Sequence, residues 1–168
     1  IEQGEAHEGT HAVKLSGEQT KDAVIYQMLR PGLRPDADYA AGAWVRSDEA
    51  RRGGAMLQVK IIYRDKSLRT DVWERRFPSA AHDWKQEEIS FRPKGPERFI
   101  LIRLEAGDAG TVWLDDFYLK QAGGDNLIEN GSFETGQPGR WQLSAENLPG
   151  EQELHDRYFW FLVEHGVC

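Results

Sequence analysis

Short segments rich in β-forming residues alternate with turn residues through the first 120 residues of the chain. The segments cover residues 10–16, 22–30, 39–46, 56–64, 69–77, 85–91, 98–105 and 111–119. Glycine, proline and aspartate mark most of the intervals, and one strand per about 8–12 residues is typical of sandwiches and barrels. No segment before residue 121 has the periodicity of an amphipathic helix. The pattern therefore predicts an all-β domain.

Alternation between apolar and polar residues within these segments predicts which side chains face water. In 57–64 the odd positions are apolar and the even ones are mainly polar, so one face meets the core and the other meets solvent. Trp73 shares its parity with Asp71 and Arg75, so we expect it on the polar side of its strand. The same reasoning predicts six solvent-facing side chains of interest, which are Trp44, Tyr26, Gln58, Trp73, Arg103 and Glu105.

The distribution of charge argues against a nucleic-acid partner. The net charge of −7 is concentrated in the C-terminal part, because residues 1–120 hold 19 basic and 20 acidic side chains whereas residues 121–168 hold 2 and 8. A body of mixed charge has no basic stripe for phosphates. The apolar stretches are also far shorter than the about 20 residues that span a bilayer. The single cysteine, Cys168, excludes an internal disulfide.

The amino-acid composition changes after residue 121, and this change suggests the domain organisation. Residues 121–124 read Gln-Ala-Gly-Gly, which is typical of a flexible junction. We therefore predict a β-sandwich module over 1–122 and a separate acidic segment over 123–168.

Motifs of known catalytic chemistry are missing from the sequence. There is no G-x-S-x-G, Walker lysine loop, G-x-G-x-x-G or H-E-x-x-H. Glu87 and Glu88 are adjacent on a strand, so they point to opposite faces and cannot flank one glycosidic bond. An autonomous hydrolase would need tail residues such as Glu151, Glu153 and His155 to complete a site. We therefore expect a non-catalytic protein.

The adjacent carboxylates of Asp115 and Asp116 lie within an otherwise apolar strand. One of two neighbouring strand side chains faces inward, where an uncompensated charge is costly. Either a hard cation held by oxygen ligands offsets that cost, or the strand bulges so that both carboxylates reach solvent.

Several motifs in order resemble those of a known protein family. They are His7-Glu8-Gly9-Thr10-His11 with the following strand, Tyr39-Ala40-Ala41-Gly42-Ala43-Trp44-Val45-Arg46, His82-Asp83-Trp84, and Gly110-Thr111-Val112-Trp113-Leu114-Asp115-Asp116-Phe117-Tyr118-Leu119. The chain over residues 7–120 resembles the jelly-roll carbohydrate-binding modules of the xylan- and β-glucan-binding type, which have a galactose-binding-like fold. The resemblance implies a jelly-roll β-sandwich of about eight to nine antiparallel strands.

One motif of that family is displaced in this chain. Asn126-Leu127-Ile128-Glu129-Asn130-Gly131-Ser132-Phe133-Glu134, followed by Trp141, resembles the first strand of such modules but comes after the body. Residue 126 either opens a second, truncated module or begins the displaced first strand of the sandwich. In the second case the strand pairs within one chain or is exchanged in a dimer through 126–134.

The resemblance also implies a structural calcium ion. Its ligands would be Glu134, the region of Glu8 and Gly9, and Asp115 or Asp116.

The function that the resemblance implies is binding of a polysaccharide, which targets a linked glycoside hydrolase in a secreted or cell-surface bacterial protein. Pyranose rings stack on aromatic side chains, and their hydroxyls need partners such as glutamine, arginine and glutamate. Trp44, Tyr26, Gln58, Trp73, Arg103 and Glu105 supply that mixture. The alternative is a structural or interaction sandwich of a multidomain extracellular protein that binds no sugar.

Overall fold

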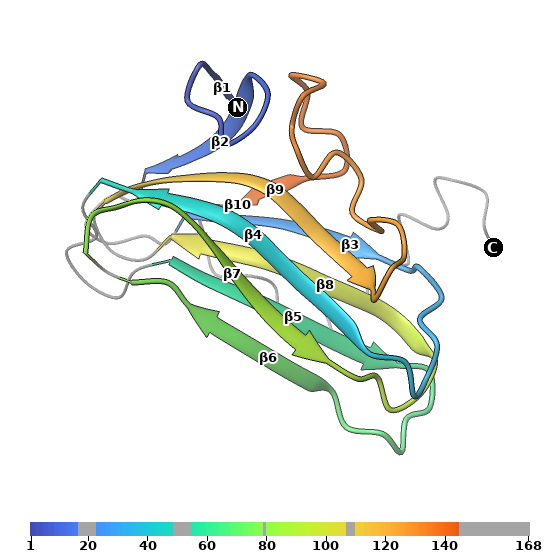
Figure 1. Cartoon of the computed structure of the whole chain (residues 1–168). Coiled ribbons are helices and arrows are strands. Elements are labelled where there is room, and N and C mark those ends of the chain that lie inside the picture. The colour runs from blue at the N-terminus through green and yellow to red at the C-terminus, as the bar shows by residue number, and fades with distance from the viewer. Residues whose placement is uncertain (17–22, 49–54, 79, 107–109, 145–168) are drawn as a thin grey trace.

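The protein is a β-sandwich of two five-stranded antiparallel sheets in a computed structural model that describes residues 1–16, 23–48, 55–78, 80–106 and 110–144 (Figure 1). The strands are β1 (Glu2–Gln3), β2 (His11–Ser16), β3 (Ala23–Leu29), β4 (Tyr39–Ser47), β5 (Ala55–Tyr63), β6 (Asp71–Arg76), β7 (His82–Phe91), β8 (Glu97–Ala106), β9 (Thr111–Gln121) and β10 (Gln142–Ser144). The described residues contain no helix that could cross a membrane.

Non-consecutive strands are neighbours in both sheets. The first sheet has the order β1-β2-β9-β4-β7 and the second has the order β10-β3-β8-β5-β6. Figure 1 shows the first sheet lying over the second with the strands roughly aligned, as is usual for a sandwich. The predicted all-β class and the predicted eight segments are confirmed. β7 begins three residues earlier than expected, because His82 pairs with Ser47 beyond a register shift.

The core lies between the sheets and follows the predicted alternation. Leu57, Val59 and Ile61 of β5 are fully buried, and so are the opposite residues of β8. Side chains at the intervening positions point to the outer face of the second sheet, because successive strand residues face opposite ways. The core thus fixes which side chains of this sheet can form a binding surface.

The segment with the displaced motif packs on the body of its own chain. Phe133 is completely buried and Trp141 is 5% exposed, and both rings contact Phe117 of β9. β10 then pairs with β3, which places it at the edge of the second sheet (Figure 1). The backbone N–H of Phe117 donates to the carbonyl oxygen of Gly131 at 2.9 Å. Residues 126–144 therefore complete the sandwich from within the chain, and the acidic tail beyond them lies outside the described residues.

A β-bulge in β9 carries the two adjacent aspartates. The register between β4 and β9 shifts between Gly42 and Trp44, and Asp116 has a positive φ of 48°. A bulge adds one residue to one strand and redirects its side chains. The strand is therefore bulged, as one of the two alternatives predicted. That alternative also placed both carboxylates in solvent, whereas Asp115 is fully buried.

Candidate functional site

A row of polar side chains crosses the outer face of the second sheet. Arg103 of β8 lies directly opposite Tyr26 of β3 on one side and Gln58 of β5 on the other. The row continues to Glu74 of β6 beyond Gln58 and to Gln142 of β10 beyond Tyr26. With strands about 4.8 Å apart, five strands give a row of about 19 Å. We call these five residues the polar row.

Hydrogen bonds hold the side chains of the polar row in place. The hydroxyl of Tyr26 donates to Oε1 of Gln142 at 2.6 Å, and Nε2 of Gln58 donates to Oε1 of Glu74 at 2.6 Å. The guanidinium of Arg103 donates to Oε2 of Glu105 at 2.9 Å. Amide, guanidinium and carboxylate groups with fixed orientation are the groups that recognise the hydroxyls of a rigid polar ligand.

The centre of the row is sheltered from bulk solvent. Gln58 is 9% exposed, and the side chains of Arg103 and Glu105 are 18% and 21% exposed. Nε of Arg103 is buried and has no hydrogen-bond partner among the described residues. A buried donor without a partner costs free energy unless a water or a ligand satisfies it. The row thus combines satisfied groups that position the site with one donor that still needs an acceptor.

Apolar side chains flank the polar row on the same face. Val24, Tyr26, Phe99 and Leu101 form a second cluster of buried residues, separate from the main core, and Met28 packs against it with Ile62. Val24, Tyr26, Phe99 and Leu101 are each at most 3% exposed, so they pack around the polar row and contribute little accessible area of their own.

Trp73 does not join the row, and the prediction that it shares the face of Gln58 is wrong. Trp73 lies directly opposite Val59, a fully buried residue, so its ring is on the inner side of β6. It packs against Phe91 with ring centroids 5.1 Å apart and borders the main core. The prediction assumed that a residue alternating in step with charged residues faces solvent. It failed because β6 is an edge strand, where charged side chains can lie at the rim of the inner face.

Trp44 lies on the other sheet, so its predicted grouping with Tyr26 and Gln58 is also wrong. It belongs to β4 and stacks on the ring of His7 with a centroid distance of 3.7 Å and an interplanar angle of 14°. His7 therefore covers one face of the indole. The expectation failed because alternation assigns the face of a strand but not the sheet to which the strand belongs.

The predicted metal ligands gather at one turn, that of residues 7–11. The buried carboxylate of Asp115 accepts hydrogen bonds from the backbone N–H of His7 at 2.9 Å and of Asp116 at 2.8 Å. The N–H of Glu8 donates to it at 3.3 Å. Burial raises the pKa of Asp115 to about 6, although the amide donors oppose that change. Nδ1 of His7 contacts Asp116 at 2.9 Å.

Glu134 binds the same turn from the docked segment. Its carboxylate accepts hydrogen bonds from the N–H groups of Thr10 and His11, both at 2.9 Å, and from the hydroxyl of Thr10 at 2.9 Å. These donors lower the pKa of Glu134 to about 2. Gly9 has a φ of +72°, and a Cβ there would lie 2.5 Å from Cδ of Glu134. Glycine is thus required for the close approach.

In this arrangement backbone amides occupy the carboxylates that were predicted to bind calcium. Calcium takes about six to eight oxygen ligands, whereas the carboxylates of Asp115 and Glu134 face N–H donors. Among the residues that the structure describes, no group of three or more histidine, cysteine, aspartate or glutamate side chains could hold a metal ion. The calcium ion stays a prediction, and unfolding with and without a chelator would test it.

Two members of the polar row, Glu74 and Gln142, were missed by the sequence reasoning. Glu74 neighbours Trp73 and has the opposite parity, so an inner position for Trp73 would have predicted it. Gln142 follows the motif tryptophan Trp141, and only the docking of its segment brings it beside Tyr26. Residues 151–155, considered for a hydrolase, lie outside the described residues.

Solved structures with a similar fold include carbohydrate-binding modules. "Family 16 Carbohydrate Binding Module-2" has a TM-score of 0.56 and 24% identity, covering 71% of this chain and 82% of that one. The PbXyn10C carbohydrate-binding module in its apo form has a TM-score of 0.52 and 19% identity, covering 80% of each chain. The enzymatically active domain of bacteriophage CBA120 tailspike protein 4 has a TM-score of 0.53 and 10% identity, covering 66% of this chain but 15% of that one.

These comparisons establish the fold. No family pattern and no curated protein sequence matches the chain. The fold expected from the sequence motifs is thus confirmed, and the chain has the β-sandwich architecture of carbohydrate-binding modules.

Proposed function

We propose that the protein is a non-catalytic carbohydrate-binding module that holds a polysaccharide along the polar row of the second sheet. The observation that carries this proposal is the alignment of Gln142, Tyr26, Arg103, Gln58 and Glu74 as direct neighbours across five strands. A row of about 19 Å suits an extended chain better than a single small molecule.

The chemistry of the row supports a neutral glycan. Arg103 supplies donors and Glu74 supplies acceptors, while Gln58 supplies both. A sugar hydroxyl both donates and accepts, so it can bridge such groups. The ion pair of Arg103 with Glu105 leaves no net positive charge to attract a polyanion.

A module of this kind acts by concentrating its partner near the glycan. We propose that it is linked to a glycoside hydrolase in a secreted or cell-surface protein and that it raises the local substrate concentration for that domain. The similar fold of the PbXyn10C module supports the sugar-binding part of this proposal.

Native affinity electrophoresis tests the proposal directly. The chain is run through gels that contain xylan, β-glucan, mannan or pectin, beside Gln58→Ala and Arg103→Ala. Gln86→Ala is the matched control, because Gln86 is an exposed glutamine of β7 in the other sheet. We expect retardation by at least one glycan and its loss in the two row variants. If no glycan retards the folded protein, that result would instead support the alternative, a structural or interaction domain that binds no sugar.

A further inference from the structure

Four apolar side chains lie together on the outer face of the second sheet, next to the polar row. Met28 of β3 is directly opposite Leu101 of β8, and Phe99 of β8 is opposite Ile62 of β5. All four belong to the second cluster of buried residues, apart from the main core. We call these four residues the apolar floor.

Two members of the apolar floor are buried as deeply as residues of the core. Phe99 and Leu101 are each 1% exposed. The first sheet covers the inner face of the second, where Ile100 and Ile102 point, so it does not shield side chains of the outer face. Such burial on an outer face indicates that a further segment lies over the apolar floor.

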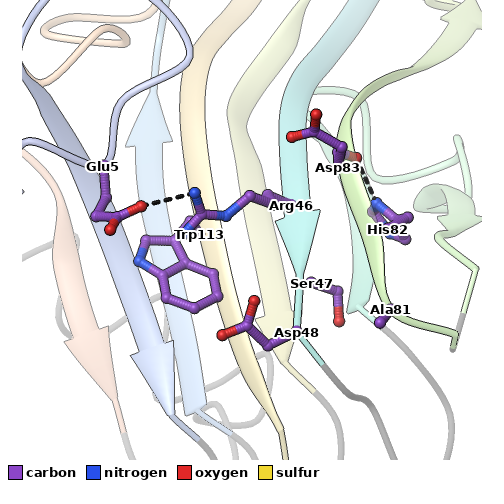
Figure 2. Close-up of a pocket in the computed structure, with 8 residues that line it drawn as sticks. All are labelled: Glu5, Arg46, Ser47, Asp48, Ala81, His82, Asp83 and Trp113. Carbon is purple, nitrogen blue, oxygen red and sulfur yellow. Dashed lines mark hydrogen bonds and ion pairs between the residues drawn. The ribbon is translucent and has the colours of Figure 1, made fainter.

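Two tryptophans on the outer face of the first sheet are already covered by neighbouring side chains. Figure 2 shows Arg46 beside Trp113, with 4.1 Å between Cζ and the ring centroid, and its ion pair with Glu5. His7 stacks on the ring of Trp44 in the same sheet. These rings have partners within the body of the chain, so the apolar floor is the better place for a further apolar segment.

Basic side chains border the apolar floor. Lys60 of β5 lies between Leu101 of β8 and Val72 of β6. Arg30 follows Met28 by two positions, so the alternation of the strand places it on the same side of the sheet. A segment that binds here therefore needs apolar side chains for the floor and acidic side chains for its border.

The C-terminal residues 145–168 have this composition. Residues 158–163 read Tyr-Phe-Trp-Phe-Leu-Val, and burying such a run against apolar surface is favourable. Residues 145–168 hold five acidic side chains and one basic side chain. Because the segment is tethered to the sheet by β10, its local concentration there is high.

The path from β10 to the apolar floor crosses the polar row. Ser144, the last residue of β10, pairs with Val24 of β3. Along β3, Tyr26 of the polar row lies between Val24 and Met28 of the apolar floor. Met28 is about 14 Å from Val24 along the strand, and the 14 residues from 144 to 158 reach up to about 46 Å when extended. The chain is therefore long enough to turn back over the outer face.

We propose that residues 158–163 dock on the apolar floor and that residues 145–157 then cross the polar row, so that the C-terminal segment shields the glycan site of its own chain. The docking depends on the floor and the segment alone, whereas the shielding rests on the proposed function. A glycan binds when the segment is displaced, and its apparent dissociation constant rises by the reciprocal of the open fraction.

Methionine methyl groups report on docking in the full chain. The sequence has two methionines, Met28 and Met56, so ¹³C-methyl labelling gives two signals, and Met56→Leu assigns them. An aromatic ring that packs on the apolar floor shifts the methyl signal of Met28 by its ring current. The test variant, called the serine variant, combines Phe159→Ser, Trp160→Ser and Phe161→Ser.

Lys60→Glu gives a second test, because it reverses a charge that faces the acidic segment. Lys85→Glu is the matched control, at an exposed lysine of β7 in the other sheet. We expect the Met28 signal to move in the serine variant, to move in the same direction in Lys60→Glu, and to stay in place in Lys85→Glu. Melting curves check that each variant folds.

Glycan affinity tests the shielding. For a segment that covers the polar row in about nine of ten molecules, the serine variant binds a retained glycan about tenfold more tightly than the parent. Isothermal titration calorimetry with the glycans of the gel experiment measures the difference.

Three results would overturn the proposal, each in a different part. An equal Met28 signal in the parent and the folded serine variant overturns the docking. A shifted Met28 signal with equal glycan affinity overturns the shielding. If the serine variant binds no glycan, the proposed function and the shielding both fail, while the Met28 signal still decides the docking.

Discussion

The carboxylate of Glu134 accepts a hydrogen bond from the backbone N–H of Thr10 at 2.9 Å and so joins positions 124 residues apart. Thr10 lies just before β2, and Glu134 lies in the segment that leads to β10. This contact fastens the displaced motif to the N-terminal turn, and the burial of Phe133 and Trp141 packs the motif against Phe117 of β9.

The Glu134 contact predicts a pH-dependent contribution to stability. Its folded-state pKa of about 2 lies below the ordinary value of 4.5, so the contribution is complete above pH 4.5 and is lost as the pH falls toward 2. Glu134→Gln should lower the melting temperature at pH 7, and the difference from the parent should narrow below pH 4.5. Circular dichroism melts across this pH range measure it. A difference that does not change with pH would contradict the assignment.

The burial of Trp141 predicts how much the docked segment contributes to the free energy of unfolding. Its indole is 5% exposed and lies 4.7 Å from Phe117 and 5.5 Å from Phe133 between ring centroids. Trp141→Ala should lower the free energy of unfolding by about 3–5 kcal/mol, as for other large buried aromatic residues. Urea denaturation measures the change. The neighbouring Arg140→Ala removes only an exposed ion pair with Glu129 and should change stability by less than about 1 kcal/mol.

A side chain at Gly131, in the same segment, is expected to clash with the backbone of β9. A Cβ at this position would overlap the carbonyl oxygen of Phe117, a backbone atom that cannot rotate away. The adjacent backbones are also joined by the N–H of Phe117 and the carbonyl oxygen of Gly131. Gly131→Ala should therefore destabilise the fold by about 1–3 kcal/mol, as overpacking does. Ser132→Ala is the control, and equal urea midpoints for the two variants would contradict this packing.

The fold was largely predictable from the sequence because its strands are local patterns. Alternation in β5 and β8 correctly placed Leu57 and Ile102 in the core and Gln58 and Arg103 outside. The turn residues between the strands then located their ends within a few positions.

The arrangement of the site was less predictable, because it depends on contacts between distant segments. Alternation could not show that Trp44 and Gln58 belong to different sheets, nor that Trp73 turns toward Phe91. Gln142 and Glu134 reach the body only through long-range pairing, and Asp115 is satisfied by amides of a turn more than 100 residues away.

The central claim is that the polar row binds a polysaccharide, and the most direct measurement is the dissociation constant for a retained glycan in Arg103→Ala. Arg103 is the middle residue of the row, and its unpartnered Nε needs an acceptor. Loss of hydrogen bonds from a charged donor weakens binding by about 10- to 100-fold. The account predicts that loss in Arg103→Ala and an unchanged affinity in Gln86→Ala. Equal affinity in the parent and folded Arg103→Ala would contradict it.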